Sequence, residues 1–218
     1  MHLILPRALL ALLFALAVAA CGPANPSRTE APALAPLAGG QGEAAAARAV
    51  FAAGCFWCVE QAFDGVEGVL ATVSGYTGGH VPDPGYRAVT SGRTGHFEAL
   101  EVSYDPQVVS YETLLATFWR NVDPTDDGGQ FCDRGSSYRG AIFALDEDQR
   151  RSAEASRQAL IDDPDAPAPI VTPVLPGAPF YAAEDYHQNY YQKNPLRYGY
   201  YKNACGRVAR LAEVWGPA

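Results

Sequence analysis

The feature that most constrains this chain is a short buried strand that leads directly into a cysteine-bearing helix. Residues 49–52 are apolar on both faces, as expected of a strand inside a sheet, and Gly54 ends the strand. The segment 55–63 has helical periodicity, with three apolar residues on one face: Phe56, Val59 and Phe63. Because a helix N-terminus offers unpaired N–H groups and a partial positive charge, it favours a thiolate at Cys55.

A second cysteine, Cys58, lies one helical turn after Cys55 and within reach of a disulfide to it. The two could instead be buried structural thiols, since cysteine is among the most buried residue types. Haem attachment needs a histidine where Val59 stands, and a zinc site needs another ligand pair, whereas Cys132 and Cys205 are solitary. A thioredoxin-like disulfide oxidoreductase that uses Cys55 and Cys58 is the alternative from another chemistry.

The N-terminal segment has the pattern of a lipoprotein signal. Arg7 precedes an apolar run, residues 9–20, that is too short for a comfortable membrane span. Small residues then precede Cys21, as they do where a bacterial signal peptide is removed and the cysteine is lipidated. We therefore expect residues 1–20 to be a signal peptide and Cys21 to be the lipid site. The protein would then be exported and anchored to a bacterial membrane, facing the periplasm or the cell exterior.

The remaining chain divides into a tether and a folded domain. Residues 21–47 are rich in Ala, Pro and Gly and have almost no aromatic or β-branched residues, so they predict a disordered tether. Residues 48–218 are long enough for one domain with a sizeable core. The formal net charge of the chain is −8, which argues against a nucleic-acid partner because such binding surfaces are normally basic.

Hydrophobic patterning in the folded domain alternates between strands and helices. Strands are expected at 49–52, 66–75, 96–104, 138–145 and 169–176, and helices at 55–63, 86–91, 110–122, 146–161 and 181–194. The segment from there to Trp215 shows no clear pattern and is expected to be an irregular C-terminal tail. The order of elements favours an α+β fold, a two-layer α/β sandwich with a mixed or antiparallel sheet built on a β-α-β-β-α-β core.

The expected strand at 96–104 places a carboxyl group among apolar residues. Glu98 shares one face of this strand with Leu100 and Val102, and Glu101 lies on the other face. Burial should raise the pKa of Glu98 and keep it protonated, so that it can donate a hydrogen bond. The alternative is a strand carboxylate that faces solvent, which fits Glu101 better than Glu98.

Further motifs accompany the cysteine motif along the chain. They are Gly54-Cys55-Phe56-Trp57, Ser74-Gly75-Tyr76-Thr77-Gly78-Gly79, Thr94-Gly95-His96-Phe97-Glu98, Phe118-Trp119, Asp123-Pro124, Asp133 through Tyr138-Arg139, and Glu184-Asp185-Tyr186-His187-Gln188. In these motifs, over roughly residues 51–195, the chain resembles the A-type peptide methionine sulfoxide reductases. The resemblance implies that residues 48–218 are a catalytic domain that reduces the S epimer of methionine sulfoxide, free or in proteins, and so repairs oxidative damage.

The resemblance also implies the residues of the site. Cys55 would be the nucleophile, and Phe56 and Trp57 match the walls of the pocket for the substrate's S-methyl group. The groups around the sulfoxide oxygen match Tyr86, Glu98 and Tyr138. The surrounding substrate-binding positions match Asp133, His187 and Tyr190. Such donors are needed because a thiolate that attacks the sulfoxide sulfur pushes negative charge onto the oxygen. Electrons would come from a thioredoxin-like protein, with no cofactor and no metal.

After methionine leaves, Cys55 is a sulfenic acid, which a second thiol converts into a disulfide. Many family members lack a counterpart of Cys58 and carry resolving cysteines in a glycine-rich tail, but here residues 198–200 have no cysteine beside them. We expect Cys205, in the tail, to be a resolving thiol, with Cys58 as the first resolver or a relay. Cys132 is expected to be a structural thiol beside the site. The expected partners are oxidised proteins or free methionine sulfoxide and a thioredoxin-like reductant; we expect a monomer that contacts the membrane only through its lipid.

Overall fold

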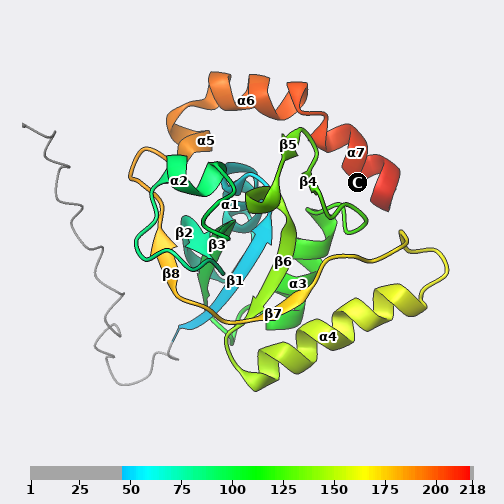
Figure 1. The fold of residues 1–218 in the computed structure, drawn as a ribbon. Coiled ribbons are helices and arrows are strands. Elements are labelled where there is room, and N and C mark those ends of the chain that lie inside the picture. Colours follow the sequence, from blue (N-terminus) through cyan, green and yellow to red (C-terminus); the bar gives the residue numbers. More distant parts are fainter. Residues whose placement is uncertain (1–45, 217–218) are drawn as a thin grey trace, which may run out of the picture. The chain divides into compact units, whose positions relative to one another are not determined.

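The computed structural model describes residues 46–216, which are drawn in colour in Figure 1. The expected signal peptide, the lipid site Cys21 and nearly all of the expected tether lie outside the described residues. The strands are β1 (Ala47–Ala53), β2 (Val69–Thr77), β3 (Phe97–Tyr104), β4 (Gly129–Gln130), β5 (Asp133–Arg134), β6 (Gly140–Ala144), β7 (Val174–Pro176) and β8 (Phe180–Ala182). The helices are α1 (Phe56–Asp64), α2 (Tyr86–Thr90), α3 (Tyr111–Arg120), the 3-10 turn η1 (Ser136–Tyr138), α4 (Glu147–Asp162), α5 (Tyr190–Lys193), α6 (Pro195–Ala204) and α7 (Arg207–Trp215). Among these helices, none has the length and apolar character that a membrane crossing requires.

Six strands form one sheet in the order β7-β6-β1-β3-β2-β8. Neighbouring strands are antiparallel except β6 and β7, which run parallel, so the sheet is mixed, as predicted. β1 lies inside the sheet because its residues 49–53 are all apolar and buried. Phe51 of β1 pairs with Leu100 of β3 on one side and with Ile142 of β6 on the other. This register brings the end of β1 beside the start of β3.

Helices cover one face of the sheet. The ring of Phe51 stacks against Phe63 of α1 and Phe118 of α3, with centroids 5.0 and 5.4 Å apart. Ala153 of α4 belongs to the same apolar core. The opposite face carries a smaller apolar cluster that includes Phe143. The predicted α+β fold with two layers is therefore confirmed.

Two predictions for the C-terminal part were wrong. Residues 181–194, expected as one helix, form β8, a connecting segment and the single-turn helix α5, because Tyr181 pairs with Tyr76 at the edge of the sheet. The tail that was expected to be irregular is helical (Figure 1, orange and red). Pro195 begins α6, where its missing N–H is not needed, and α7 begins at Arg207.

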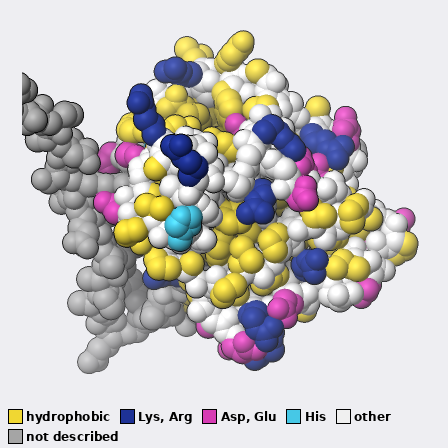
Figure 2. Space-filling model, viewed as in Figure 1, with side chains coloured by type: hydrophobic (Ala, Val, Ile, Leu, Met, Phe, Trp, Pro, Cys, Tyr) yellow, Lys and Arg dark blue, Asp and Glu magenta, His cyan; other side chains and the backbone are white. Residues whose placement is uncertain are grey.

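One face of α6 is open to solvent. Leu196 is 91% exposed and Tyr200 is 79% exposed. In the space-filling view of Figure 2, hydrophobic side chains lie along the edge that α6 forms and also across the middle of this face, with charged side chains of both signs interspersed among them. The other face of α6 points into the protein, because Tyr198 is 4% exposed.

Glu101 was expected to face solvent, but it is only 8% exposed. Its carboxylate forms an ion pair with Arg48 of the neighbouring strand β1. The side chain of Arg48 is half-exposed, so the pair reaches the surface. A buried strand carboxylate is tolerated here because a cation accompanies it.

Candidate active site

A tight turn at the end of β1 places Cys55 at the start of α1. Gly54 makes this turn with a φ of +80°, which side chains rarely adopt, and a Cβ at this position would lie 2.6 Å from Cβ of Gln130. Cys55 precedes the first helical residue, Phe56, and is 6% exposed. The sulfur is therefore held at a helix N-terminus and inside the protein.

Cys55 and Cys58 are free thiols whose side chains are hydrogen-bonded to each other. The hydrogen bond from Cys55 lowers the pKa of Cys58 to about 6, whereas burial raises the pKa of Cys55 well above its usual value. Near neutral pH the two sulfurs therefore share one proton, as a thiol and a thiolate. Burial and the neighbouring sulfur oppose ionisation of Cys55, whereas its place at a helix N-terminus favours it, so the ionisation of Cys55 stays a prediction.

Glu98 of β3 lies against the start of α1 and is 2% exposed. Its Oε2 accepts a hydrogen bond from the backbone N–H of Phe56 at 3.2 Å, so the carboxyl group occupies part of the helix N-terminus. Burial raises the pKa of Glu98 to about 8. The carboxyl group is therefore protonated at neutral pH, which agrees with the expectation from the strand pattern, and it can donate a proton.

Two tyrosine hydroxyls join the carboxyl group of Glu98. The hydroxyl of Tyr138 of η1 interacts with the carboxyl group of Glu98 and with the hydroxyl of Tyr86 of α2. The backbone N–H of Tyr86 donates to Oε1 of Glu184 at 3.0 Å, while Oε2 of Glu184 accepts from the hydroxyl of Tyr76 at 2.9 Å. Burial raises the pKa of both Tyr86 and Tyr138, so both hydroxyls keep their protons and can donate.

An aromatic cluster lies beside the two thiols. Trp57 stacks on Tyr190 with ring centroids 3.8 Å apart, and its indole N–H donates to Nδ1 of His187 at 3.1 Å. The ring of His187 also lies 5.0 Å from Phe56 and 4.6 Å from Tyr86. Burial lowers the pKa of His187 to about 4, so the imidazole is neutral. The cluster therefore offers apolar ring surfaces without a positive charge.

Two tyrosines of α6 contact the thiols, and the sequence analysis missed both. Tyr198 and Tyr201 pack with Cys55 and Cys58, while the hydroxyl of Tyr198 donates to Gln61 and that of Tyr201 donates to Asp133. Their three-residue spacing places them on one face of a helix. The spacing predicts a shared face only if residues 195–204 are helical, and the sequence pattern did not predict a helix there.

Cys132 and Cys205 form a disulfide. Cys205 was expected to be a free resolving thiol and Cys132 a lone structural thiol, but because they are bonded to each other neither offers a thiol in this structure. Asp133 lies beside this disulfide and accepts a hydrogen bond from Tyr201. Cys132, Asp133 and Cys205 are the one group of three potential metal-ligating side chains in residues 46–216. Metals bind cysteine as a thiolate, so these bonded sulfurs do not fit a metal site.

The fold thus collects the expected site residues from separate elements. Around the two thiols lie Phe56, Trp57, Tyr86, Glu98, Tyr138, His187 and Tyr190, with Asp133 reached through Tyr201. Two thiols that close into a disulfide supply two electrons, and the neutral proton donors beside them suit a substrate that loses an oxygen. The fold and the site together define the class of the protein as a thiol-dependent oxidoreductase.

Comparison with known proteins identifies the family. The chain belongs to the peptide methionine sulfoxide reductases, because the family model of that description matches residues 47–217. Over 168 residues it is 51% identical to the peptide methionine sulfoxide reductase MsrA of Bacillus subtilis, covering 77% of this chain and 95% of that protein. Over 168 residues it is 54% identical to the MsrA of Streptococcus equi subsp. zooepidemicus, covering 77% and 98%.

Solved structures agree with this assignment. The methionine sulfoxide reductase A of Corynebacterium diphtheriae is 34% identical, with a TM-score of 0.63 over 71% of this chain and 78% of that one. Mxr1 from Saccharomyces cerevisiae in its reduced form is 29% identical, with a TM-score of 0.64 over 69% and 87%. The protein is therefore an enzyme that reduces methionine sulfoxide in a thiol-dependent reaction.

Proposed function

We propose that the enzyme reduces the S epimer of methionine sulfoxide, free or within oxidised proteins, with Cys55 as the nucleophile and Cys58 as the resolving thiol. The observation that carries the proposal is the hydrogen-bonded pair of buried thiols with the protonated carboxyl group of Glu98 at the same helix N-terminus. The thioredoxin-like alternative would use the same two cysteines. It gives no role to the donors that surround them, Tyr86, Glu98 and Tyr138.

In the first step, Cys55 passes its proton to the sulfur of Cys58 as it attacks the sulfoxide sulfur. Negative charge develops on the sulfoxide oxygen, where Glu98 supplies a proton and the two tyrosines, Tyr86 and Tyr138, donate hydrogen bonds. The sulfur–oxygen bond breaks, the oxygen is transferred to Cys55 as a sulfenic acid, and methionine leaves. The methionine sulfur gains the two electrons that the Cys55 sulfur loses.

The aromatic cluster holds the substrate during this step. Phe56 and Trp57 offer ring faces to the S-methyl group, since thioether and methyl groups pack well against aromatic rings. His187 fixes the indole through the hydrogen bond to its N–H, and Tyr190 covers one face of the indole. Asp133 acts indirectly. It accepts a hydrogen bond from Tyr201 and so orients the hydroxyl that lies beside Cys55.

In the second step, the Cys58 sulfur attacks the sulfenic sulfur of Cys55. A disulfide forms, and the hydroxyl group leaves as water with the remaining proton. Cys58 is the resolving thiol because it already contacts Cys55, whereas the sulfur of Cys205 is bonded to Cys132. A thioredoxin-like protein then reduces the Cys55–Cys58 disulfide by thiol–disulfide exchange, so that cysteines carry all the electrons and no cofactor takes part.

One equivalent of methionine S-sulfoxide, added without reductant, is expected to give about one equivalent of methionine and one Cys55–Cys58 disulfide. Both cysteines lie in one tryptic peptide, residues 49–87, so the disulfide is measured by mass and by its resistance to alkylation. The R epimer is the matched control and should leave both thiols free. A new disulfide between Cys55 and Cys205, or equal reduction of the R epimer, would contradict the proposal.

We further propose that the enzyme is exported and lipid-anchored through Cys21, because an apolar run and small residues precede that cysteine. Cys21→Ala should move the enzyme from the membrane fraction to the soluble fraction and abolish labelling with a fatty-acid analogue, since no acyl chain is then attached. Ser27→Ala, in the expected tether, is the control and should stay membrane-bound. Unchanged membrane association of Cys21→Ala would exclude the anchor.

A further inference from the structure

Arg207 is a buried cation beneath the catalytic turn. It is the first residue of α7 and is 3% exposed. Its Nη1 donates to the carbonyl oxygen of Ala53 at 3.3 Å, two residues before Cys55, and its Nη2 donates to the carbonyl oxygen of Asn121. Its guanidinium also lies over the ring of Phe131, 4.5 Å from the centroid. The charge is therefore held under the residues that carry the nucleophile.

No carboxylate among residues 46–216 forms an ion pair with Arg207. A guanidinium stays charged in proteins, and burying a charge without a counter-charge is costly. Asp133 interacts with Arg207 electrostatically without forming an ion pair, and burial raises the pKa of Asp133. Two carbonyl oxygens accept hydrogen bonds from Arg207 and a ring lies against its guanidinium, but none of these contacts supplies an anion.

We propose that Arg207 is the counter-charge of the Cys55–Cys58 thiols, a positioning residue that keeps one of the two buried sulfurs ionised without touching the substrate. This inference rests on the proposed roles of the two cysteines. A thiolate in a buried site needs a nearby cation, because burial alone favours the neutral thiol. Arg207 comes from the C-terminal helices, so these helices contribute to the chemistry as well as covering the site.

The other charged and titratable groups around the thiols do not supply an equivalent buried cation. Cys58 faces Tyr198, Lys202 and Arg207, and Cys55 faces Glu98, Tyr86 and Tyr201. The two positive charges in this set are those of Lys202 and Arg207, and Lys202 is half-buried, so solvent screens it more. Glu98 and the tyrosines oppose the thiolate when they ionise. The hydrogen bond from Cys55 lowers the pKa of Cys58 most, and the positive charge of Arg207 is the next largest cause that lowers it.

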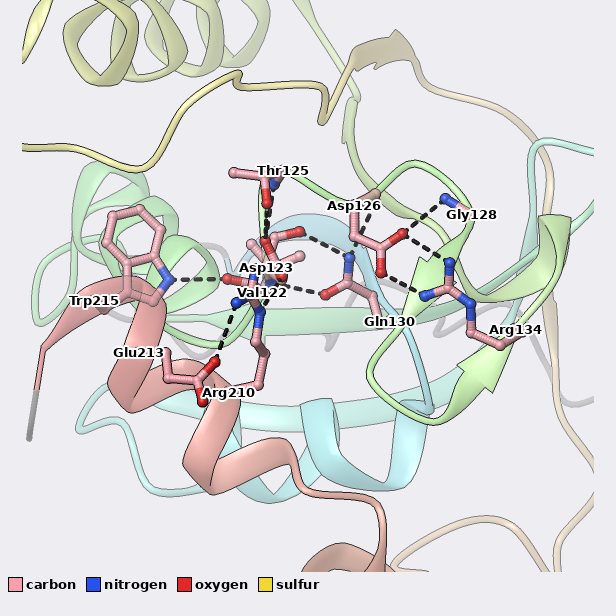
Figure 3. A network of polar contacts seen from close by, with 10 residues as sticks. All are labelled: Val122, Asp123, Thr125, Asp126, Gly128, Gln130, Arg134, Arg210, Glu213 and Trp215. Carbon is pink, nitrogen blue, oxygen red and sulfur yellow. Dashed lines mark hydrogen bonds and ion pairs between the residues drawn. The ribbon is translucent and has the colours of Figure 1, made fainter.

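Contacts at the start and the end of α7 hold Arg207 in this place. Arg210 pairs with Asp123 at 2.7 Å, and the indole N–H of Trp215 donates to the carbonyl of Val122 at 2.9 Å (Figure 3). The side chain of Gln130 in turn bonds both backbone groups of Asp123, accepting at 2.8 Å and donating at 2.9 Å. The loop after α3 therefore anchors α7. The two arginines of α7 differ, because Arg210 forms an ion pair with an acid and Arg207 does not.

The test is the pH dependence of alkylation at Cys55 and Cys58 in the full chain without substrate, followed on the tryptic peptide 49–87 with iodoacetamide. Arg207→Gln removes the charge but keeps an amide that can donate to the carbonyl oxygens. We expect its alkylation midpoint to rise by about one pH unit, so that the labelling rate below the midpoint falls about tenfold. If the substitution only changed the access of iodoacetamide to the thiols, the maximum labelling rate would change but the pH midpoint of labelling would not.

Arg210→Gln is the matched control on the same helix and should keep the wild-type midpoint, because its charge is already paired. Arg207→Lys keeps a positive charge and should also stay near the wild-type midpoint. An unchanged midpoint in Arg207→Gln, an equal rise in Arg210→Gln, or a full rise in Arg207→Lys would each overturn the proposal. If Arg207→Gln does not fold, Arg207→Met takes its place, because it also removes the charge and should show the same rise of the midpoint. Alkylation is measured without turnover. A negative result would therefore exclude the role of Arg207 without contradicting the roles of Cys55 and Cys58 in sulfoxide reduction, which are tested separately.

Discussion

Cys55→Ser is expected to abolish reduction of methionine S-sulfoxide, lowering the rate by about 10⁴-fold or more. A serine hydroxyl at this position keeps its proton at neutral pH and is a far weaker nucleophile than a sulfur that can hand its proton to Cys58. It also forms no sulfenic acid, so the oxygen has no acceptor on the protein. The measurement is chromatographic quantification of methionine formed in the presence of excess dithiothreitol.

Cys58→Ser is the matched control for this prediction. It keeps the attacking sulfur and removes both the resolving thiol and the sulfur that accepts the Cys55 proton. In the absence of reductant it should therefore form at most one equivalent of methionine, more slowly than the wild type, and accumulate a sulfenic acid at Cys55. Dimedone labelling of the peptide 49–87 detects that product. The control matters because Cys58 has the lower pKa of the two. If Cys58→Ser were inactive while Cys55→Ser still released one equivalent of methionine, the roles of the two cysteines would be exchanged.

The parts of the site that could be predicted depend on local patterns. The strand before Cys55 is apolar on both faces and ends at a glycine, so the position of the sulfur at a helix N-terminus follows from a few adjacent residues. The alternation around Glu98 likewise placed its carboxyl group on a buried face. Both features survive in the fold because tertiary packing reinforces the local preference.

The parts that could not be predicted depend on contacts between distant segments. Cys132 and Cys205 are 73 residues apart, and no local pattern reveals that they meet. Residues 195–204 are helical although Gly199 and several aromatic residues weaken the intrinsic preference, because Tyr198 packs against the two thiols. The pKa of Cys55 belongs to the same group, since it is raised by burial, which depends on how the whole chain packs around the sulfur.

Glu98→Gln is the second prediction with a large expected effect. Glutamine keeps the size of the side chain and can still donate a hydrogen bond, but it cannot deliver a proton to the sulfoxide oxygen. The single-turnover rate of methionine formation at neutral pH should therefore fall by about 10²–10⁴-fold, the usual contribution of a general acid. Rapid quenching at a saturating concentration of sulfoxide isolates this step from disulfide reduction.

The pH profile separates loss of the proton donor from a loss of structure. In the wild-type enzyme the rate should rise as the pH passes about 6, where Cys58 ionises, and fall above about 8, where the raised pKa of Glu98 lets its carboxyl group lose the proton that it must donate. Glu98→Gln should keep the rise near pH 6 and lose the fall near pH 8, because an amide does not titrate. Glu101→Gln makes the same chemical change on the opposite face of β3 and should retain both the rate and both limbs. A fall near pH 8 that persists in Glu98→Gln would assign that titration to another group and remove Glu98 from the role of acid.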